Sequence, residues 1–212
     1  MFKDRKDAGR QLAEKLAAYR GNAGTVVLAL PRGGVPVGYE IARALKLPLD
    51  VFVVRKLGTP GQPELAMGAI ASGGVRVLNR EVVDAFNIPD AWIEEIAASE
   101  LEELARRERQ YRGERPPVVA SGRTVILVDD GLATGSTMRA AVAALKQEGA
   151  KKIVVAVPVG AQASCDALAR EVDEVVCADI PEHFWAVGQW YQDFEQTSDE
   201  EVRALLATEN NS

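Results

Sequence analysis

Two neighbouring carboxylates, Asp129 and Asp130, follow an apolar run in the segment VILVDDGLATGST, residues 125–137. The apolar run predicts a buried strand, and two aspartates at its end add nothing to a hydrophobic core. The residues after them are small or carry hydroxyl groups, and a helix is predicted to begin at Ser136. Backbone N–H groups at a helix N-terminus form a site for an anion. The segment therefore combines acceptors for two hydroxyl groups with a cradle for one phosphate, as a ribose 5-phosphate requires.

Other phosphate-binding turns fit this segment less well. A P-loop ends in Gly-Lys-Ser or Gly-Lys-Thr, whereas Thr134-Gly135-Ser136 contains no lysine. A dinucleotide-binding turn places three glycines where this segment has two aspartates. A glycine-rich turn without any ligand stays open as an alternative.

The segment resembles the phosphoribosyl diphosphate (PRPP) motif of the type I phosphoribosyltransferases, with four apolar residues, two acidic residues, two variable residues and ATGST. The resemblance implies that Asp129 and Asp130 bind the 2- and 3-hydroxyls of the PRPP ribose. It implies that the 5-phosphate is wrapped by the segment that follows, Ala133, Thr134, Gly135, Ser136 and Thr137. The implied reaction transfers the phosphoribosyl group to a nitrogen of a purine or pyrimidine base and releases pyrophosphate, in nucleotide salvage. Mg²⁺ is the implied cofactor, bound through PRPP and contacted by Asp129 or Asp130 through water.

A second anion site is expected for the pyrophosphate. In LPRGGVPVG, Arg32 is a strong phosphate donor, and Gly33 and Gly34 let the backbone approach closely. The resemblance implies a strained or cis peptide near Arg32-Gly33. In VVRKLG, Arg55 and Lys56 end a buried run, where two cations are costly unless solvated or paired, and the resemblance assigns Lys56 and also Arg55 to pyrophosphate. The alternatives are an ordinary strand-to-helix turn and a surface pair of basic residues.

The polar stretch TPGQPE, rich in proline and glycine, predicts a loop. It resembles the flexible loop, here from Gly58 to Glu64, that closes over the active site in this family. Closure would exclude water from a centre that water can hydrolyse. Glu64 is the only carboxylate of this loop and is a candidate acid or base, the alternative being an exposed loop glutamate.

The aromatic-rich segment DIPEHFWAVGQWYQDF, residues 179–194, follows the last predicted strand. It resembles the hood of the purine-type enzymes, which implies that Phe184 or Trp185 stacks on the base and that Asp193 contacts the base edge. Core packing or a dimer contact is the alternative. Two departures put a 6-oxopurine in doubt. Ala133 stands where the hypoxanthine type has an aspartate, and VPVGAQAS after the fourth strand lacks that type's lysine.

Strands that are apolar on both faces alternate with helices along the chain, which predicts an α/β fold: a Rossmann-like parallel sheet flanked by helices. Such sheets bind ligands at the carboxyl ends of their strands. Strands are predicted near 25–30, 49–58, 124–130, 151–160 and 174–179, with a hairpin turning at Gly73-Gly74. Helices are predicted at 4–19, 35–47, 90–112, 136–147, 161–170 and 198–207.

One phosphoribosyltransferase domain is expected over residues 1–212. Its core covers about 25–178, with a helical insertion at about 80–115, a small hood at about 179–194 and a C-terminal helix at about 198–208. The insertion lengthens the usual span between the pyrophosphate loop and the ribose motif, and is expected to serve as a dimer element or a lid.

Composition restricts the function further. The net charge of −6 disfavours a general nucleic-acid binder. Neither a signal peptide nor a membrane span is recognisable, so a cytoplasmic protein without a membrane partner is expected. Cys165 and Cys177 are interpreted as free thiols, and the single histidine, His183, leaves no cluster for zinc. An α/β hydrolase lacks support because no nucleophile elbow is present.

Two function classes remain. The first is the transferase, with Asp129, Asp130 and Glu64 as its catalytic residues, and the resemblance implies a homodimer or a larger assembly. The alternative is a regulatory protein that keeps the fold and senses PRPP or nucleotides without efficient catalysis. The basic pair at 55–56 and the loop after it favour the enzyme.

Overall fold

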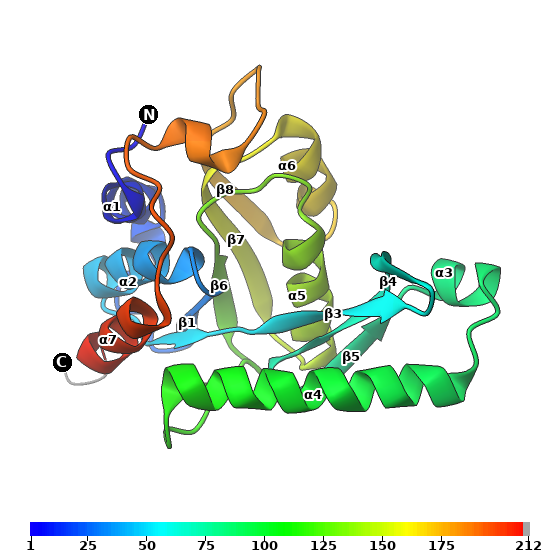
Figure 1. Cartoon of the computed structure of the whole chain (residues 1–212). Coiled ribbons are helices and arrows are strands. Elements are labelled where there is room, and N and C mark those ends of the chain that lie inside the picture. The colour runs from blue at the N-terminus through cyan, green and yellow to red at the C-terminus, as the bar shows by residue number, and fades with distance from the viewer. Residues whose placement is uncertain (210–212) are drawn as a thin grey trace.

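The computed structural model describes residues 1–209, except for the side chains of residues 63, 64 and 209. Its main sheet has five parallel strands in the order β2-β1-β6-β7-β8 (Figure 1). The strands are β1 (Thr25–Ala29), β2 (Leu49–Val51), β6 (Thr124–Val128), β7 (Lys152–Val159) and β8 (Glu174–Asp179). The predicted Rossmann-like α/β architecture is therefore confirmed.

Helices cover both faces of this sheet, which explains why the central strands are apolar on both sides. α1 (Arg5–Lys15), α2 (Gly34–Leu45) and α7 (Asp199–Glu209) lie on one side, and α5 (Ser136–Gln147) and α6 (Gln162–Ala169) lie on the other (Figure 1). Alternate residues of β6 face the two layers. Ile126 and Val128 pack with α1 and α2, whereas Val125 and Leu127 pack with α5 and α6.

A second, antiparallel sheet corrects one predicted strand. The apolar run 49–58 is divided between β2 and β3 (Val54–Thr59), and β3 pairs with β4 (Gln62–Ala71), which pairs with β5 (Val75–Leu78). A continuous apolar run cannot show where a chain leaves one sheet for another, since both environments are buried. The hairpin turn at Gly73-Gly74 is confirmed, as a short 3₁₀ turn (Ser72–Gly74) between β4 and β5.

The predicted loop at 58–64 is largely part of a hairpin. Thr59 of β3 pairs with Gln62 of β4, so only Pro60 and Gly61 remain between the strands. Gly61 has a φ of 77°, the left-handed conformation that a tight turn takes from glycine. The backbone of Glu64 lies in β4, and its side chain lies outside the described part of the structure.

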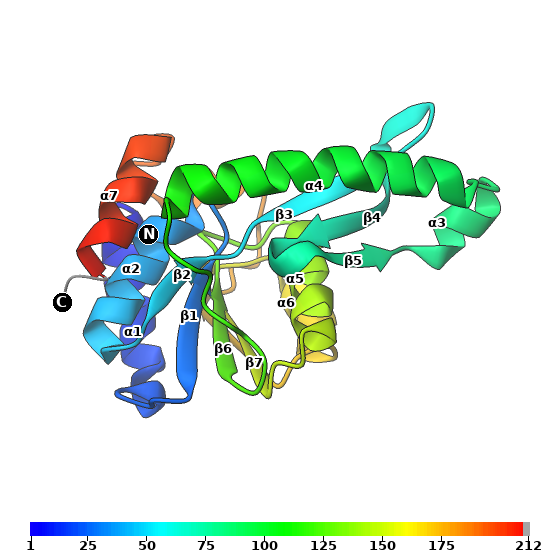
Figure 2. The same cartoon turned by 90° about the horizontal axis from the view of Figure 1, so that it is seen from below.

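The predicted helical insertion at about 80–115 consists of two helices. One is the short α3 (Arg80–Ala85), for which no separate helix was predicted, and the other is the long α4 (Asp90–Arg112), whose predicted bounds are confirmed. α4 crosses the small sheet and reaches α7 (Figure 2). A buried ion pair fixes its end: Nε of Arg112 lies 3.0 Å from each carboxylate oxygen of Asp50, in β2. Asp50 also accepts a 2.9 Å hydrogen bond from the backbone N–H of Val118. The insertion is thereby tied to the edge of the main sheet.

The remaining short elements are 3₁₀ turns at Ala17–Tyr19 and Val187–Trp190. The second belongs to the hood and precedes Tyr191, which pairs with Phe2 at the start of the chain. α7 begins with a side-chain cap, since the Ser198 hydroxyl accepts from the N–H of Glu201 at 3.1 Å. Over residues 1–209, the structure contains no helix with the length and hydropathy of a membrane span.

Candidate functional site

The loops after β1 and β6 meet because these strands are parallel neighbours, with Ala29 paired to Val128. A Cβ at Gly33 would lie 2.0 Å from Oδ2 of Asp130, and a Cβ at Gly34 would lie 2.7 Å from the carbonyl oxygen of Val128. Both distances are far below a normal carbon–oxygen contact. The two glycines therefore allow the loop that carries Arg32 to lie directly on the aspartate pair, and the Pro31–Arg32 peptide in this loop is cis.

A Gly33→Ala variant is expected to lose activity through this contact. The new methyl group must displace the Asp130 carboxylate from its position, and misplacement of a binding group by about 1 Å costs on the order of 10²-fold in rate. Gly24→Ala is the matched control, because its nearest contact would be an ordinary 3.4 Å to the Asn22 side chain. Steady-state pyrophosphate release and thermal unfolding of both variants measure the effect, and equal rates for Gly33→Ala and wild type would contradict it.

The segment after the aspartates is fixed to the end of β7. The N–H of Leu132 donates to Val159 O at 2.8 Å, and Leu132 O accepts from the N–H of Ala161 at 2.9 Å. The Ser164 hydroxyl donates to Ala133 O at 2.5 Å. Gly135, with a φ of 74°, turns the chain into α5. This loop is thereby held rigidly with its hydroxyls and N–H groups at a helix N-terminus.

A cavity of about 180 Å³ lies at this turn. It is lined by Asp129, by Val187 of the hood and by residues 131–138, which include Ala133, Thr134, Gly135, Ser136 and Thr137. The structure thus brings the first aspartate and the whole predicted phosphate segment to one cavity. Val187 was not singled out by the sequence analysis, because an isolated valine in an aromatic-rich segment carries no chemical signal.

Asp130 points in a different direction, toward α1. Its Oδ2 accepts from Nε of Arg5 at 2.8 Å, and Arg5 also donates to Glu195 O at 2.6 Å. The Arg5 guanidinium stacks over the ring of Phe194, 3.9 Å from its centroid. The hydroxyl of Tyr191 donates to the backbone oxygen of Asp130 at 2.6 Å. Arg5 is a site residue that the sequence analysis missed, since nothing in an amphipathic helix marks one arginine as reaching a distant loop.

Burial makes it energetically unfavourable for Asp129 and Asp130 to be ionised together. Burial, and then the charge of Asp130, raise the pKa of Asp129 well above its ordinary value. Burial also raises the pKa of Asp130, although the Arg5 charge acts in the opposite direction. The pair therefore favours a proton, a cation or hydrogen-bond donors beside it.

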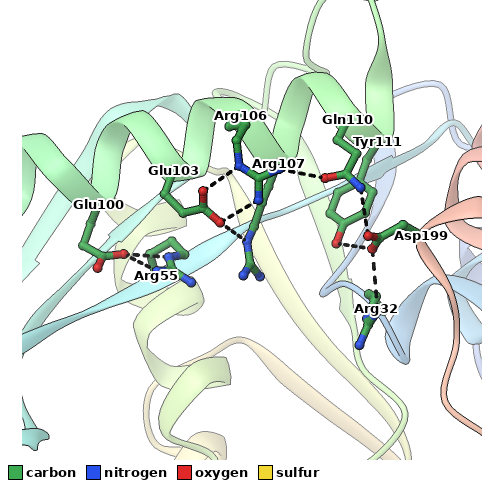
Figure 3. Close-up of polar contacts among 9 residues, drawn as sticks. All are labelled: Arg32, Arg55, Glu100, Glu103, Arg106, Arg107, Gln110, Tyr111 and Asp199. Atoms are coloured by element: carbon green, nitrogen blue, oxygen red, sulfur yellow. Dashed lines mark hydrogen bonds and ion pairs between the residues drawn. The ribbon is translucent and has the colours of Figure 1, made fainter.

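The three basic side chains that were predicted to bind pyrophosphate lie on two sides of β3. Lys56 is exposed and lines a cavity of about 350 Å³ together with Ser136 and Thr137. Arg55, on the opposite face of the strand, pairs with Glu100 of α4 at 2.6 Å. Arg32 lies 3.8 Å from Asp199, at the start of α7 (Figure 3). Lys56 is thus next to the phosphate segment, while both arginines face carboxylates of neighbouring helices.

The predicted base-binding residues do not share one cavity. Trp185 is 82% exposed at the hood, whereas Phe184 is partly buried and packs against the cluster that contains Phe2 and Tyr191. Asp193 is exposed, accepts a 3.0 Å hydrogen bond from the N–H of Glu195, and lines a different cavity of about 270 Å³. Trp185 is therefore the aromatic side chain of the two that is free to meet a ligand.

Comparisons with known proteins identify the family of this chain. The family described as "Phosphoribosyl transferase domain" matches residues 2–195. Two relatives from Mycobacterium tuberculosis, strains CDC 1551 / Oshkosh and ATCC 25618 / H37Rv, carry the provisional name phosphoribosyl transferase. Each is 51% identical over 206 residues, which are 97% of this chain and 46% of the relative. The chain thus spans about half the length of the curated relatives it matches.

A solved structure, TT1426 from Thermus thermophilus, is 44% identical, with 98% of each chain covered and a TM-score of 0.87. Because 98% of each chain is covered, the similarity of fold extends over the insertion as well as the main sheet. The family match, the curated relatives and the site geometry lead to one conclusion: this chain belongs to the phosphoribosyl transferase domain family.

Proposed function

We propose that the protein transfers the phosphoribosyl group of PRPP to a ring nitrogen of a purine or pyrimidine base, with Mg²⁺, and releases pyrophosphate. The observation that carries this proposal is the single cavity shared by Asp129 and the whole of residues 131–138. A phosphate-binding turn alone fits many ligands, whereas the Asp129 carboxylate in the same cavity favours a phosphorylated sugar with free hydroxyls. A role in nucleotide salvage follows from the same substrates.

In this proposal, each group of residues around the cavity has a separate role in binding or in stabilising charge. Asp129 and Asp130 accept hydrogen bonds from the ribose hydroxyls and favour the positive charge that develops at C1. The N–H and hydroxyl groups of residues 133–137 hold the 5-phosphate. Arg32, Lys56, Arg55 and the amides of Gly33-Gly34 stabilise the negative charge on the leaving group. The C1–O bond breaks with its electron pair going to pyrophosphate, and the base nitrogen forms the new C1–N bond with inversion.

The proton released by the base nitrogen needs an acceptor, and Glu64 is the proposed one. The base itself is proposed to stack on Trp185 or Phe184, with Asp193 at its edge. Trp185 is the stronger candidate for stacking, because its ring is 82% exposed. A homodimer is proposed as the assembly that carries out the reaction.

The donor set fits Mg²⁺. This ion prefers carboxylate, phosphate and water oxygens, and Asp129 offers a carboxylate whose pKa is raised by burial and by the adjacent Asp130. A bound cation offsets both of these effects. When present, Mg²⁺ supplies charge neutralisation of the pyrophosphate.

The test is to incubate the protein with PRPP, Mg²⁺ and a panel of purines and pyrimidines, and to follow pyrophosphate. Base-dependent release by wild type, and strongly reduced release by Asp130→Asn, are expected. Full release by Asp130→Asn would contradict the assignment of this residue. Tight PRPP binding without release for any base would instead favour the regulatory protein that senses PRPP.

A further inference from the structure

The inserted helix α4 turns a row of charged residues toward the loops of the site. Glu100, Glu103 and Arg107 recur at helical spacing along an edge of its buried face, which packs against β3 and α7. Tyr111 continues this row and donates from its hydroxyl to Asp199 at 3.1 Å. Arg32 and Arg55 therefore lie on the side of α4 that carries this row of residues (Figure 3).

Three guanidinium groups lie on this side of α4, and each is paired with a carboxylate. Arg55 of β3 pairs with Glu100, and Arg32 of the loop after β1 pairs with Asp199. The third is Arg107, whose Nε donates to Glu103 at 2.8 Å. Burial and the Asp199 carboxylate raise the pKa of Tyr111, and the charges of Arg107 and Arg32 both oppose this rise. Tyr111 and Arg32 thus meet at one carboxylate, Asp199, although they come from different parts of the chain.

Arg107 differs from its neighbour Arg106 in the number of guanidinium nitrogens that already donate hydrogen bonds within the protein. Arg106 donates from Nε and Nη2 to Glu103 and from Nη1 to Gln110, so all three nitrogens are used on the surface of α4. Arg107 uses only Nε, and its two Nη groups make no hydrogen bond to any residue within 1–209 that the structure describes. Figure 3 shows its guanidinium extending away from α4 on the side of Arg55 and Arg32.

Paired Nη groups of an arginine match the oxygens of a phosphate. We propose that Arg107 is a third arginine of the pyrophosphate site, supplied by the inserted helix, and that it binds the pyrophosphate part of PRPP together with Arg32 and Arg55. The carboxylates Glu100, Glu103 and Asp199 hold the three guanidinium groups in place until the pyrophosphate binds. This inference rests on the proposed phosphoribosyl transfer, because it assigns a ligand group of that reaction.

The matched pair Arg107→Gln and Arg106→Gln tests this role. Both variants remove one charge from adjacent positions of α4 and leave Glu103 with one arginine. Calorimetric titration with PRPP, with inorganic pyrophosphate and with ribose 5-phosphate, each with Mg²⁺, separates the parts of the ligand. For Arg107→Gln, we expect about tenfold to hundredfold weaker binding of PRPP and pyrophosphate, as for the loss of charge-assisted hydrogen bonds. Binding of ribose 5-phosphate should be unchanged.

Arg106→Gln should bind all three ligands as wild type does, and both variants should unfold at the wild-type temperature, because exposed ion pairs contribute little. Equal PRPP and pyrophosphate affinities for the two variants would overturn the role of Arg107 and leave the proposed function intact. A loss of ribose 5-phosphate binding by Arg107→Gln would also overturn it, since the effect would then be structural. Failure of the wild-type protein to bind PRPP would overturn both proposals.

Discussion

An Asp129→Asn variant is expected to lose on the order of 10²-fold in turnover, the usual cost of removing one group that stabilises developing charge. The same variant is expected to unfold at a higher temperature than wild type. The two effects have one cause, because the carboxylate that we propose favours the positive charge at C1 is buried next to Asp130. Asparagine keeps the shape of the side chain and removes the charge.

The sign of the stability effect follows from the direction of the pKa shift. The pKa of Asp129 is raised in the folded protein above its ordinary value of 3.8. The unfolded chain therefore releases this proton at lower pH, and the ionised carboxylate makes the folded state less stable once the pH exceeds that ordinary value. The Asp129→Asn substitution would relieve this cost at neutral pH. Asp130→Asn is expected to stabilise less, because the Arg5 charge already offsets part of the cost.

Thermal unfolding between pH 4 and 8 and the pH dependence of kcat/KM measure both effects. We expect the difference in Tm between Asp129→Asn and wild type to grow as the pH rises through the raised pKa. We expect the acid limb of wild-type kcat/KM to lie above the pH at which an ordinary carboxylate protonates. A lower Tm together with wild-type turnover would show that Asp129 is a structural residue.

An Arg112→Leu variant is expected to lose about 3–5 kcal/mol of unfolding free energy, because it leaves a buried carboxylate without its partner. Arg112 and Asp50 are each only 7% exposed, and Arg112 also donates to Val51 O at 3.3 Å. This contact fixes the C-terminal end of α4 to β2. The loss should therefore exceed that of any exposed ion pair on α4.

A double variant separates the buried charge from the packing. Arg112→Leu with Asp50→Asn should recover part of the loss, since an asparagine oxygen can still accept from the N–H of Val118 and the Asp50 charge is removed. The recovery should be incomplete, because the Glu108 carboxylate, 3.5 Å from Nη1 of Arg112, also loses this partner. Arg106→Leu, on the exposed side of the same helix, should change stability by less than about 1 kcal/mol. Urea unfolding of the three variants gives these free energies. A change for Arg112→Leu as small as that for Arg106→Leu would refute the anchoring role.

The sequence predicted those parts of this protein that depend on local pattern. The bounds of α4 and α5 agree with the predicted 90–112 and 136–147, because proline, glycine and hydroxyl residues mark helix ends within a few positions. The parallel sheet followed from apolar runs separated by helices. The structure brings Asp129 and residues 131–138 to one cavity. The sequence could predict this because these residues are contiguous, so a single loop and one helix N-terminus bring them together.

Tertiary packing decided which distant residues complete the site. Arg5 reaches Asp130 across 125 positions of sequence, and Val187 of the hood lines the cavity of the phosphate segment. The apolar run 49–58 divides between two sheets, and this places Arg55 against α4 and Lys56 against α5. Side-chain alternation gives the two faces of a strand, but only the packed neighbours determine what each face meets. The sequence by itself therefore determined the fold and the contiguous segment 129–137 of the candidate site, whereas the partners of each charge depend on contacts between elements far apart in the chain.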